Sequence, residues 1–367
     1  YPGYEAQCPP EAEDRQQNAN WHFLRHACRL LTPPIKVVKP GGFTFHFEDP
    51  SFLNMRLCML GFGAQGRAEA HNLRRSGVEF KLGLRKDGRS AKKAREDGFQ
   101  VYSIDEALKE SQAVLMNLPD EAQSEIYHQH IRPIAPTYLI FAHGFNTYFR
   151  KIPVEQGIKH ILIAPKGAAW ALKEYYQGPN ALPAILAYQD EKTEQAPSQE
   201  KKWIEKLAVD LGCRSSALTW ARFQDETVCD LFSEQALLCG GVSSLLRAAY
   251  DTLVDNGYNP KTAYFETLFE LKLIVDLIWK YGITGMRERI SPTARYGDVT
   301  RGHRVVDEHT KNKMQKVLEE IESGEFADEF LSQSKKQEYD QRSKNQKNHR
   351  IEKVGAELRG QTHPIES

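Results

Sequence analysis

The chain alternates strand-like and helix-like segments over its first part only. Between about residues 55 and 190, helical patterns separate most of six short apolar runs, namely RLCMLGF, VEFKLGLR, AVLMNLP, TYLIFAHGF, HILIAPKG and ALPAILAY. Such alternation is typical of a parallel, doubly wound α/β sheet. We therefore expect an α/β fold with a Rossmann-like domain over residues 51–224.

The strand pattern stops at Asp225. From there apolar residues recur at helical spacing up to Gly257 and again up to Gly282, and both glycines are placed to end helices. We expect an all-α domain over residues 225–330. We expect residues 331–367 to form a polar C-terminal tail. Residues 331–350 are rich in Lys, Gln, Ser and Asn, which predicts a mobile connector or tail there.

Composition excludes several classes of function. Lys+Arg and Asp+Glu both number 49, so no net field favours nucleic acid or an anionic membrane. No apolar run approaches the roughly 18–20 residues of a membrane span. The six cysteines form no C-x-x-C pair, which fits a reducing, cytoplasmic location. Residues 1–50 are hard to interpret, and we expect a packing arm or a poorly ordered leader there.

A glycine pattern follows the first strand of the expected sheet. The run Gly61-Phe62-Gly63-Ala64-Gln65-Gly66 fits G-x-G-x-x-G and opens a helical segment. In this context the glycines permit a tight turn and bring backbone N–H groups to a pyrophosphate. We expect a dinucleotide at Gly61, Gly63, Ala64, Gln65 and Gly66.

The end of the second strand bears on which dinucleotide is bound. An acid that binds the NAD ribose is usual there, whereas this chain has Arg85, and Arg89 and Ser90 follow. Arg85 and Ser90 suit the 2′-phosphate of NADP, so NADPH is favoured. Asp87 would repel a phosphate, which keeps NADH possible, and the alternative is a solvated basic loop.

Two later strands end in residues suited to catalysis. TYLIF leads into His143 and Gly144, and HILIA leads into Lys166. Ligands of open α/β sheets bind beyond the carboxyl ends of strands. His143 could donate a proton, and Lys166 could stabilise developing negative charge. Gly144 is expected to bind the cofactor.

Two carboxylate pairs lie in the helical part, Asp230 with Glu234 and Glu266 with Glu270. Spacing of i, i+4 places both acids of a pair on one helix face. Hard oxygen ligands suit Mg²⁺. Spacing alone also allows two solvent-facing helices. We expect little polar surface beside the acids because their neighbours are apolar, namely Leu231, Phe232, Phe265, Leu268, Phe269 and Leu271.

Taken together, six motifs resemble ketol-acid reductoisomerase, in its short-chain class I form. They are GFGAQGRAEAHNLRRSG, FAHGFN, APKG, DETVCDLFSEQALLCGG, FETLFELKLIVDLI and ISPTARYGDVTRGHRV. The resemblance implies a Rossmann domain followed by a knotted all-α domain. It also implies alkyl migration in a 2-hydroxy-3-keto acid such as 2-acetolactate or 2-aceto-2-hydroxybutyrate, with reduction by NADPH to a 2,3-dihydroxy acid. That reaction belongs to valine and isoleucine biosynthesis.

The resemblance also implies roles for individual residues. Asp230 would bridge two Mg²⁺ ions and Glu234 would complete the shell of one. Glu266 and Glu270 would come from the partner of a homodimer that shares its active sites, with higher assembly possible. Ser291 would contact the substrate, and His143 and Lys166 would lie in the active site.

The chain departs from the family pattern at several positions, which leaves rate and substrate range open. These are Arg67, Ala168, Val228, Cys229, Ser233, Pro292 and Arg295. Two alternatives remain at this point. One is a plain NADP-dependent β-hydroxyacid dehydrogenase, which needs no Mg²⁺, and the other is a non-catalytic NADP-binding scaffold.

Overall fold

The computed structural model describes residues 35–38, 44–47, 52, 54–176 and 178–362. The chain divides into two compact units between Thr227 and Val228, three residues beyond the predicted domain boundary. Most of the expected N-terminal arm lies outside the described residues.

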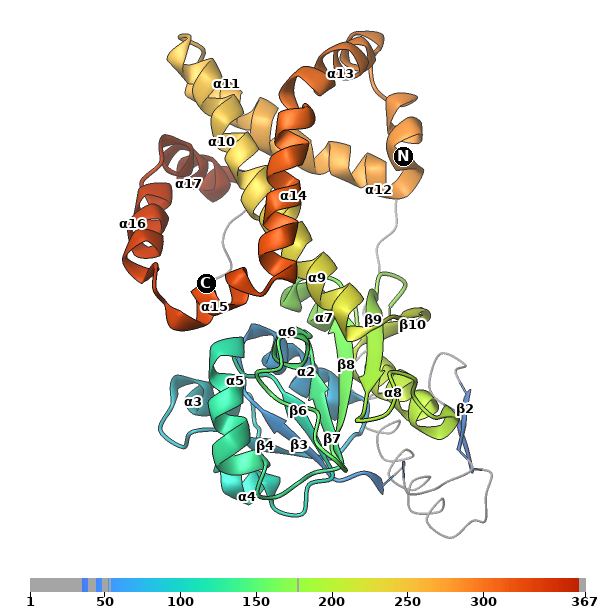
Figure 1. The fold of residues 1–367 in the computed structure, drawn as a ribbon. Helices are drawn as coiled ribbons and strands as arrows, with labels where there is room; N and C mark the ends of the chain where they lie inside the picture. The colour runs from blue at the N-terminus through green and yellow to red at the C-terminus, as the bar shows by residue number, and fades with distance from the viewer. Residues whose placement is uncertain (1–34, 39–43, 48–51, 53, 177, 363–367) are drawn as a thin grey trace. The chain divides into compact units, whose positions relative to one another are not determined.

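The first unit contains an eight-stranded sheet with the order β10-β9-β8-β7-β6-β3-β4-β5 (Figure 1). The strands are β3 (Leu57–Leu60), β4 (Phe80–Gly83), β5 (Val101–Tyr102), β6 (Ala113–Met116), β7 (Tyr138–Phe141), β8 (Lys159–Pro165), β9 (Leu182–Gln189) and β10 (Cys213–Trp220). A separate antiparallel pair joins β1 (Ile35–Val38) to β2 (Thr44–Phe47). The chain runs outward from β3 to β5 and then returns to β6 on the other side of β3. The resulting order is that of dinucleotide-binding sheets.

Alternate residues of each central strand enter two separate cores. Leu57 and Met59 of β3 face one core, whereas Cys58 and Leu60 face the other. Four helices contribute to the first core: α2 (Ala64–Arg75), α3 (Arg89–Glu96), α7 (Ala169–Glu174) and α8 (Ser198–Leu211). The second core includes α4 (Ile104–Leu108) and the π-helical η2 (Tyr127–Ile131), which follows α5 (Asp120–Ile126). The first unit is therefore an α/β/α sandwich, as the sequence predicts.

The sheet is not wholly parallel, because β9 pairs antiparallel with β8. A parallel return needs a connection long enough to run back along the strand. Between them α7 has only six residues, which span about 9 Å at the usual helical rise. The chain consequently turns at the carboxyl end of β8 and enters β9 there.

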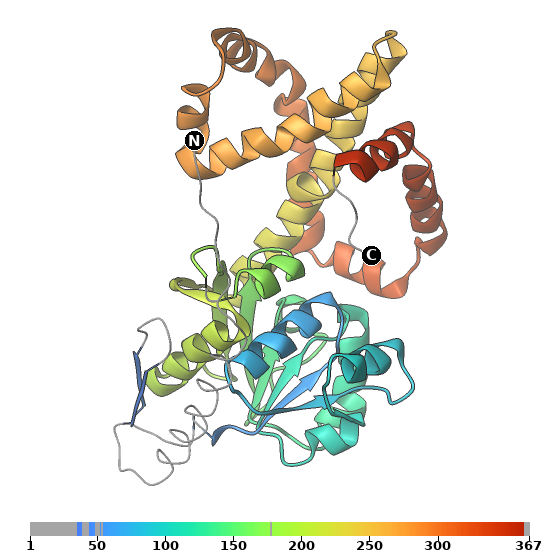
Figure 2. The same ribbon diagram turned by 180° about the vertical axis from the view of Figure 1, so that it is seen from behind.

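The second unit is helical throughout its described residues (Figure 2). Its elements, with α9 crossing the division, are α9 (Phe223–Ser233), η3 (Glu234–Leu238), α10 (Gly240–Asp255), α11 (Pro260–Tyr264), η4 (Phe265–Phe269), α12 (Glu270–Arg287), α13 (Pro292–Val305), α14 (Glu308–Glu322), α15 (Glu325–Ser332), α16 (Lys336–Lys347) and α17 (Arg350–Thr362). Gly257 adopts a positive φ just beyond α10, and Gly282 breaks the helical backbone inside α12. Both predicted interruptions are therefore present.

The segment expected to form a polar tail contains two helices, α16 within the part predicted to be mobile and α17 largely beyond it. Ile351 and Leu358 of α17 are buried in a cluster with Tyr250 and Tyr264. Asp251 of α10 adds an ion pair with Arg350 at 2.5 Å. Polar composition was a poor guide because one face of α17 is apolar. No helix in the described part of the chain is long and apolar enough to cross a bilayer.

Candidate active site

The glycine-rich loop connects β3 to the N-terminus of α2. Gly63 is the N-cap and has no side chain to accept a hydrogen bond from the first N–H groups of the helix, and the first turn contains no acid. The early backbone N–H groups of α2 are thus left for an anion. Ala64, Gln65 and Gly66 all lie in this first turn, as predicted for a pyrophosphate-binding loop.

Asn117, which directly follows β6, lies against this loop. Its backbone N–H donates to the Leu60 carbonyl at 2.8 Å. Gly61 has φ of +98°, and a Cβ added there would lie 2.0 Å from the Asn117 carbonyl oxygen. Only glycine allows this approach. The loop therefore occupies the carboxyl ends of β3 and β6, the switch point at which such sheets bind ligands.

Arg67, one of the departures noted above, has a definite partner. Its guanidinium donates to both carboxylate oxygens of Asp97, at 2.6 and 2.8 Å. The His71 ring lies 3.1 Å from the same carboxylate. The Arg67 guanidinium holds the pKa of Asp97 well below its usual range. The ion pair between Arg67 and Asp97 connects the start of α2 to the turn after α3, beside the dinucleotide loop.

The β4–α3 loop presents the residues expected to select the cofactor. Arg85 and Ser90 are both exposed, and no side-chain hydrogen bond or ion pair occupies either within the described residues. Lys86 pairs with Glu106 at 3.3 Å, so part of its charge is neutralised. Asp87 is also exposed. The cations available to a 2′-phosphate are therefore Arg85 and Arg89.

Lys166 and Gly144 meet a buried acid that the sequence analysis did not select. Lys166 Nζ donates to Glu226 Oε1 at 2.7 Å, and the Gly144 N–H donates to Oε2 at 3.4 Å. The Glu226 side chain is 1% exposed, whereas that of Lys166 is 30% exposed. A Cβ on Gly144 would lie 2.1 Å from Thr227 Oγ1. The contact between α9 and the β7–α6 loop therefore requires this glycine, which lies just before α6 (Phe145–Tyr148).

His143 has a carboxylate beside it. Its Nδ1 lies 3.5 Å from Asp120 Oδ2, and both side chains are about one quarter exposed. Asn146 donates to the Asp120 backbone oxygen at 3.1 Å, which ties the loop to the start of α5. A carboxylate in this position can orient an imidazole and stabilise its charged form.

Both acid pairs lie at π-helical turns. Asp230 belongs to α9, and Glu234 begins η3. Glu266 lies in η4, and Glu270 follows directly in α12. A π turn holds more residues than an α turn. Side chains four residues apart are therefore more nearly aligned along the helix axis than they are in an α-helix. Such turns occur often at functional sites.

One chain does not gather the four predicted metal ligands. Within the described residues, no three His, Cys, Asp or Glu side chains are grouped as a metal site would require. Glu234, Glu266 and Glu270 are exposed and Asp230 is half-buried. Beside the second pair, Phe265 and Phe269 are 36% and 44% exposed, so the surface around these acids in one chain is apolar and open.

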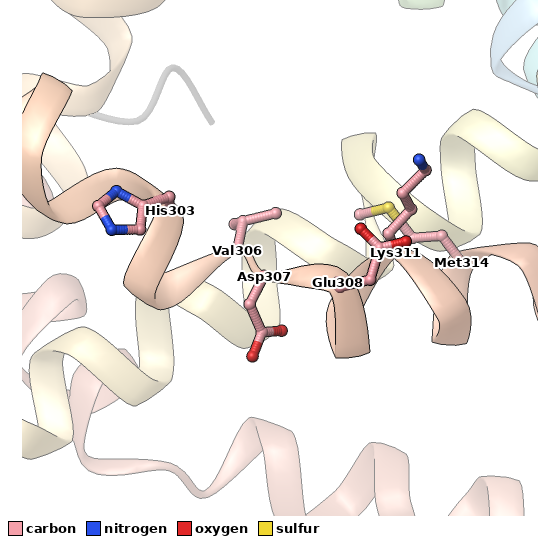
Figure 3. Close-up of a pocket in the computed structure, with 6 residues that line it drawn as sticks. All are labelled: His303, Val306, Asp307, Glu308, Lys311 and Met314. Atoms are coloured by element: carbon pink, nitrogen blue, oxygen red, sulfur yellow. The ribbon is translucent and has the colours of Figure 1, made fainter.

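Ser291 is the N-cap of α13. Its hydroxyl accepts a hydrogen bond from the Ala294 N–H at 3.1 Å, and its side chain is exposed. An open pocket of about 470 Å³ lies at the other end of α13, where the chain turns into α14 (Figure 3). Its lining residues are His303, Val306, Asp307, Glu308, Lys311 and Met314. None of them was predicted as a site residue, and Ser291 does not line it.

The sequence analysis missed two residues of the candidate site, although the sequence contains a signal for each of them. Glu226 stands four residues before Asp230, so acids recur at 226, 230 and 234 along α9 and into η3. Asp120 follows Pro119 at the carboxyl end of β6, the same sheet edge that carries His143 and Lys166.

A Rossmann unit followed by a helical unit defines a two-domain, NAD(P)-dependent oxidoreductase. Residues 52–212 match the NADPH-binding domain of acetohydroxy acid isomeroreductase, and residues 223–363 match the C-terminal domain of ketol-acid reductoisomerase. The chain belongs to the ketol-acid reductoisomerase family.

Solved structures agree with this assignment. An NADH-preferring ketol-acid reductoisomerase from an uncultured archaeon is 35% identical, with a TM-score of 0.77 over 86% of this chain and 96% of that one. A semialdehyde dehydrogenase NAD-binding protein from Cupriavidus necator is 16% identical, with a TM-score of 0.57 over 73% of this chain and 99% of that one. The second likeness extends to the fold alone.

Proposed function

We propose that this reductoisomerase acts on 2-hydroxy-3-keto acids such as 2-acetolactate, with Mg²⁺ and preferably NADPH. An alkyl group moves with its bonding electrons from C2 to C3, while the C2 hydroxyl loses its proton and becomes a carbonyl and the C3 carbonyl oxygen gains a proton and becomes a hydroxyl. Hydride from the nicotinamide then adds to C2 and a proton adds to its oxygen, giving a 2,3-dihydroxy acid. The product belongs to valine and isoleucine biosynthesis.

The observation that carries the proposal is the buried Glu226 with Lys166 as its partner. A carboxylate that is 1% exposed and bonded to an ammonium group can hold or relay a proton without exchange with bulk water. Lys166 remains 30% exposed, so its charge can also stabilise an oxyanion of the substrate. His143, oriented by Asp120, is the second candidate proton donor.

The predicted acids fit Mg²⁺ in donor type. Asp230, Glu234, Glu266 and Glu270 offer only carboxylate oxygens, which are the hard ligands that this ion prefers. When bound, Mg²⁺ would polarise the substrate carbonyl and lower the pKa of its hydroxyl. The described residues of one chain do not group these acids, and the family resemblance implies that the second pair comes from a partner, so we assign Glu266 and Glu270 to the site of a second copy.

A homodimer would also cover apolar surface on the helical unit. Several large apolar side chains along η4 and α12 are substantially exposed: Phe265, Phe269, Leu273, Val275, Trp279 and Ile283. Exposed apolar surface of this extent is typical of interaction sites. We expect Leu273→Glu to shift the molar mass in light scattering from dimer to monomer. Ile134→Glu, at an exposed apolar position of the first unit, should leave it unchanged, and a parent protein that is monomeric would contradict the shared site.

For the cofactor, Arg85, Arg89 and Ser90 support NADPH, whereas the related archaeal enzyme prefers NADH. Oxidation of NADPH and of NADH should be followed with 2-acetolactate, with and without Mg²⁺. We expect turnover only with the metal, and faster turnover with NADPH.

Asp230→Asn provides the decisive variant. It should abolish turnover while NADPH still binds, because the proposed metal ligand lies outside the glycine-rich loop. Retained turnover in this variant, or turnover of the parent without Mg²⁺, would favour the alternative function, that of a plain dehydrogenase.

A further inference from the structure

Glu69 is a buried acid in α2 that the chemistry above does not use. Its side chain is almost fully enclosed, at 2% exposure. Oε1 accepts a hydrogen bond from Gln65 Nε2 at 3.0 Å, and Oε2 accepts one from Asn117 Nδ2 at 2.6 Å. Within the described residues no lysine, arginine or histidine forms an ion pair with it. Two side-chain amides are thus its only side-chain hydrogen-bond partners there.

Both amides border the dinucleotide loop. Gln65 lies in the first turn of α2, and Asn117 directly follows β6 on the opposite side of the switch point. A Cβ on Gly66 would lie 3.1 Å from the Asn117 Cβ, so Asn117 packs directly behind the loop. Gln65 and Asn117 are half-buried, whereas Glu69 lies beneath them. The carboxylate therefore links the first turn of α2 to the residue that follows β6.

An ionised carboxylate only accepts hydrogen bonds, so each amide must turn its NH₂ group toward Glu69. This leaves each amide its carbonyl oxygen for another donor, and no hydrogen bond from the described residues reaches either oxygen. Burial raises the pKa of Glu69, while the two amide donors act in the opposite direction and favour the ionised form. The orientation of both amides thus depends on one side chain.

We propose that Glu69 is a positioning residue for the dinucleotide: it directs the carbonyl oxygens of Gln65 and Asn117 toward ribose hydroxyl groups of the cofactor. A diphosphate cannot donate hydrogen bonds to carbonyl oxygens, whereas ribose hydroxyls can. This inference rests on the assignment of a nicotinamide dinucleotide to the loop.

Glu69→Gln tests the proposal with almost no change in shape. The new amide offers one acceptor and one NH₂ group, so either Gln65 or Asn117 must reverse. We expect the Kd for NADPH and for NADH, measured by calorimetry on the whole protein, to rise about fivefold to tenfold, the value of one hydrogen bond. The kcat at saturating cofactor should stay near that of the parent. Glu79→Gln, at an exposed position, controls for the loss of a negative charge.

A double-mutant cycle with Asn117→Ala separates positioning from mere structural support. Without Asn117, the amide at position 69 can accept from Gln65 and no reversal is needed. In that background Glu69→Gln should change the Kd by less than about twofold. An equal loss in both backgrounds would refute positioning, even if the thermal midpoint falls.

The direction in which Glu69→Gln changes the Kd is a further check. If Glu69 acted only as a buried charge near the diphosphate, its neutralisation would tighten binding, and that result would overturn the proposal. A parent protein that binds neither dinucleotide would instead refute the cofactor assignment, which keeps the two failures distinct.

Discussion

His160 should make the first unit sensitive to acid. The residue lies on β8 with no measurable exposure, and its Nδ1 is 2.9 Å from Thr147 Oγ1. Its Nε2 has no hydrogen-bond partner among the residues that the structure describes. Burial lowers the pKa of His160 from 6.5 to about 3. The folded state thus excludes a proton that the unfolded chain accepts. The contribution of the neutral His160 to the free energy of unfolding is fully present above pH 6.5 and is lost as the pH drops from there toward 3.

The size of the loss follows from the two pKa values. Between pH 7 and pH 5, preferential protonation of the unfolded chain should lower the free energy of unfolding by about 2 kcal/mol. His160→Gln removes the titrating group but keeps an amide for Thr147. The variant should be less stable than the parent at pH 7, and this deficit should shrink by about 2 kcal/mol at pH 5.

Urea unfolding at several pH values, followed by the fluorescence of the buried Trp203, measures this difference. His128→Gln is a matched control at an exposed position, and its stability should follow the parent at every pH. A deficit in His160→Gln that stays constant from pH 7 to pH 5 would refute the reasoning, since the ring would then titrate alike in both states.

Three further variants test the site and the fold. Glu226→Gln should lower kcat about 10²-fold to 10⁴-fold with little change in the Kd for NADPH, and unaltered kcat would exclude the proton relay. Arg85→Ala should raise the KM for NADPH and leave that for NADH unchanged; equal effects on both would remove Arg85 from the 2′-phosphate site. Ile351→Ala should cost about 3 kcal/mol of unfolding free energy, whereas the exposed Tyr339→Ala should cost less than about 0.5. Equal costs would mean that α17 is not anchored.

The sequence predicted the Rossmann plan well because its signals are local. Six apolar runs and the loop from Gly61 to Gly66 depend only on neighbouring residues. The antiparallel direction of β9 was not predicted. The direction of this strand depends on the path that the connection through α7 takes after β8, and the apolar residues of a strand carry no information about that path. The two-residue β5 is too short to show a period.

The site was predicted less completely, for a physical reason. Asp230, Glu234, Glu266 and Glu270 were selected by helical spacing, but spacing does not show which acids lie together in one chain. Glu226 was missed because a buried acid is defined by its partners, Lys166 and the Gly144 N–H, which are distant in sequence. Glu69 was missed for the same reason, because its hydrogen-bond partner Asn117 lies 48 positions away in the sequence.

The π turns also constrain how this protein can change in length. Each accommodates one residue more than a regular helix would. Removing a single residue from η3, such as Ala236, would let the turn close with ordinary α geometry and leave the packed face of α10 nearly unchanged. The same deletion inside α10, before Tyr250, would rotate the later residues of that helix by about 100°. Tyr250 would then leave its packed position against Tyr264. A deletion of one residue can therefore be absorbed at η3 and η4, whereas a deletion in a regular helix would misdirect every helix that follows.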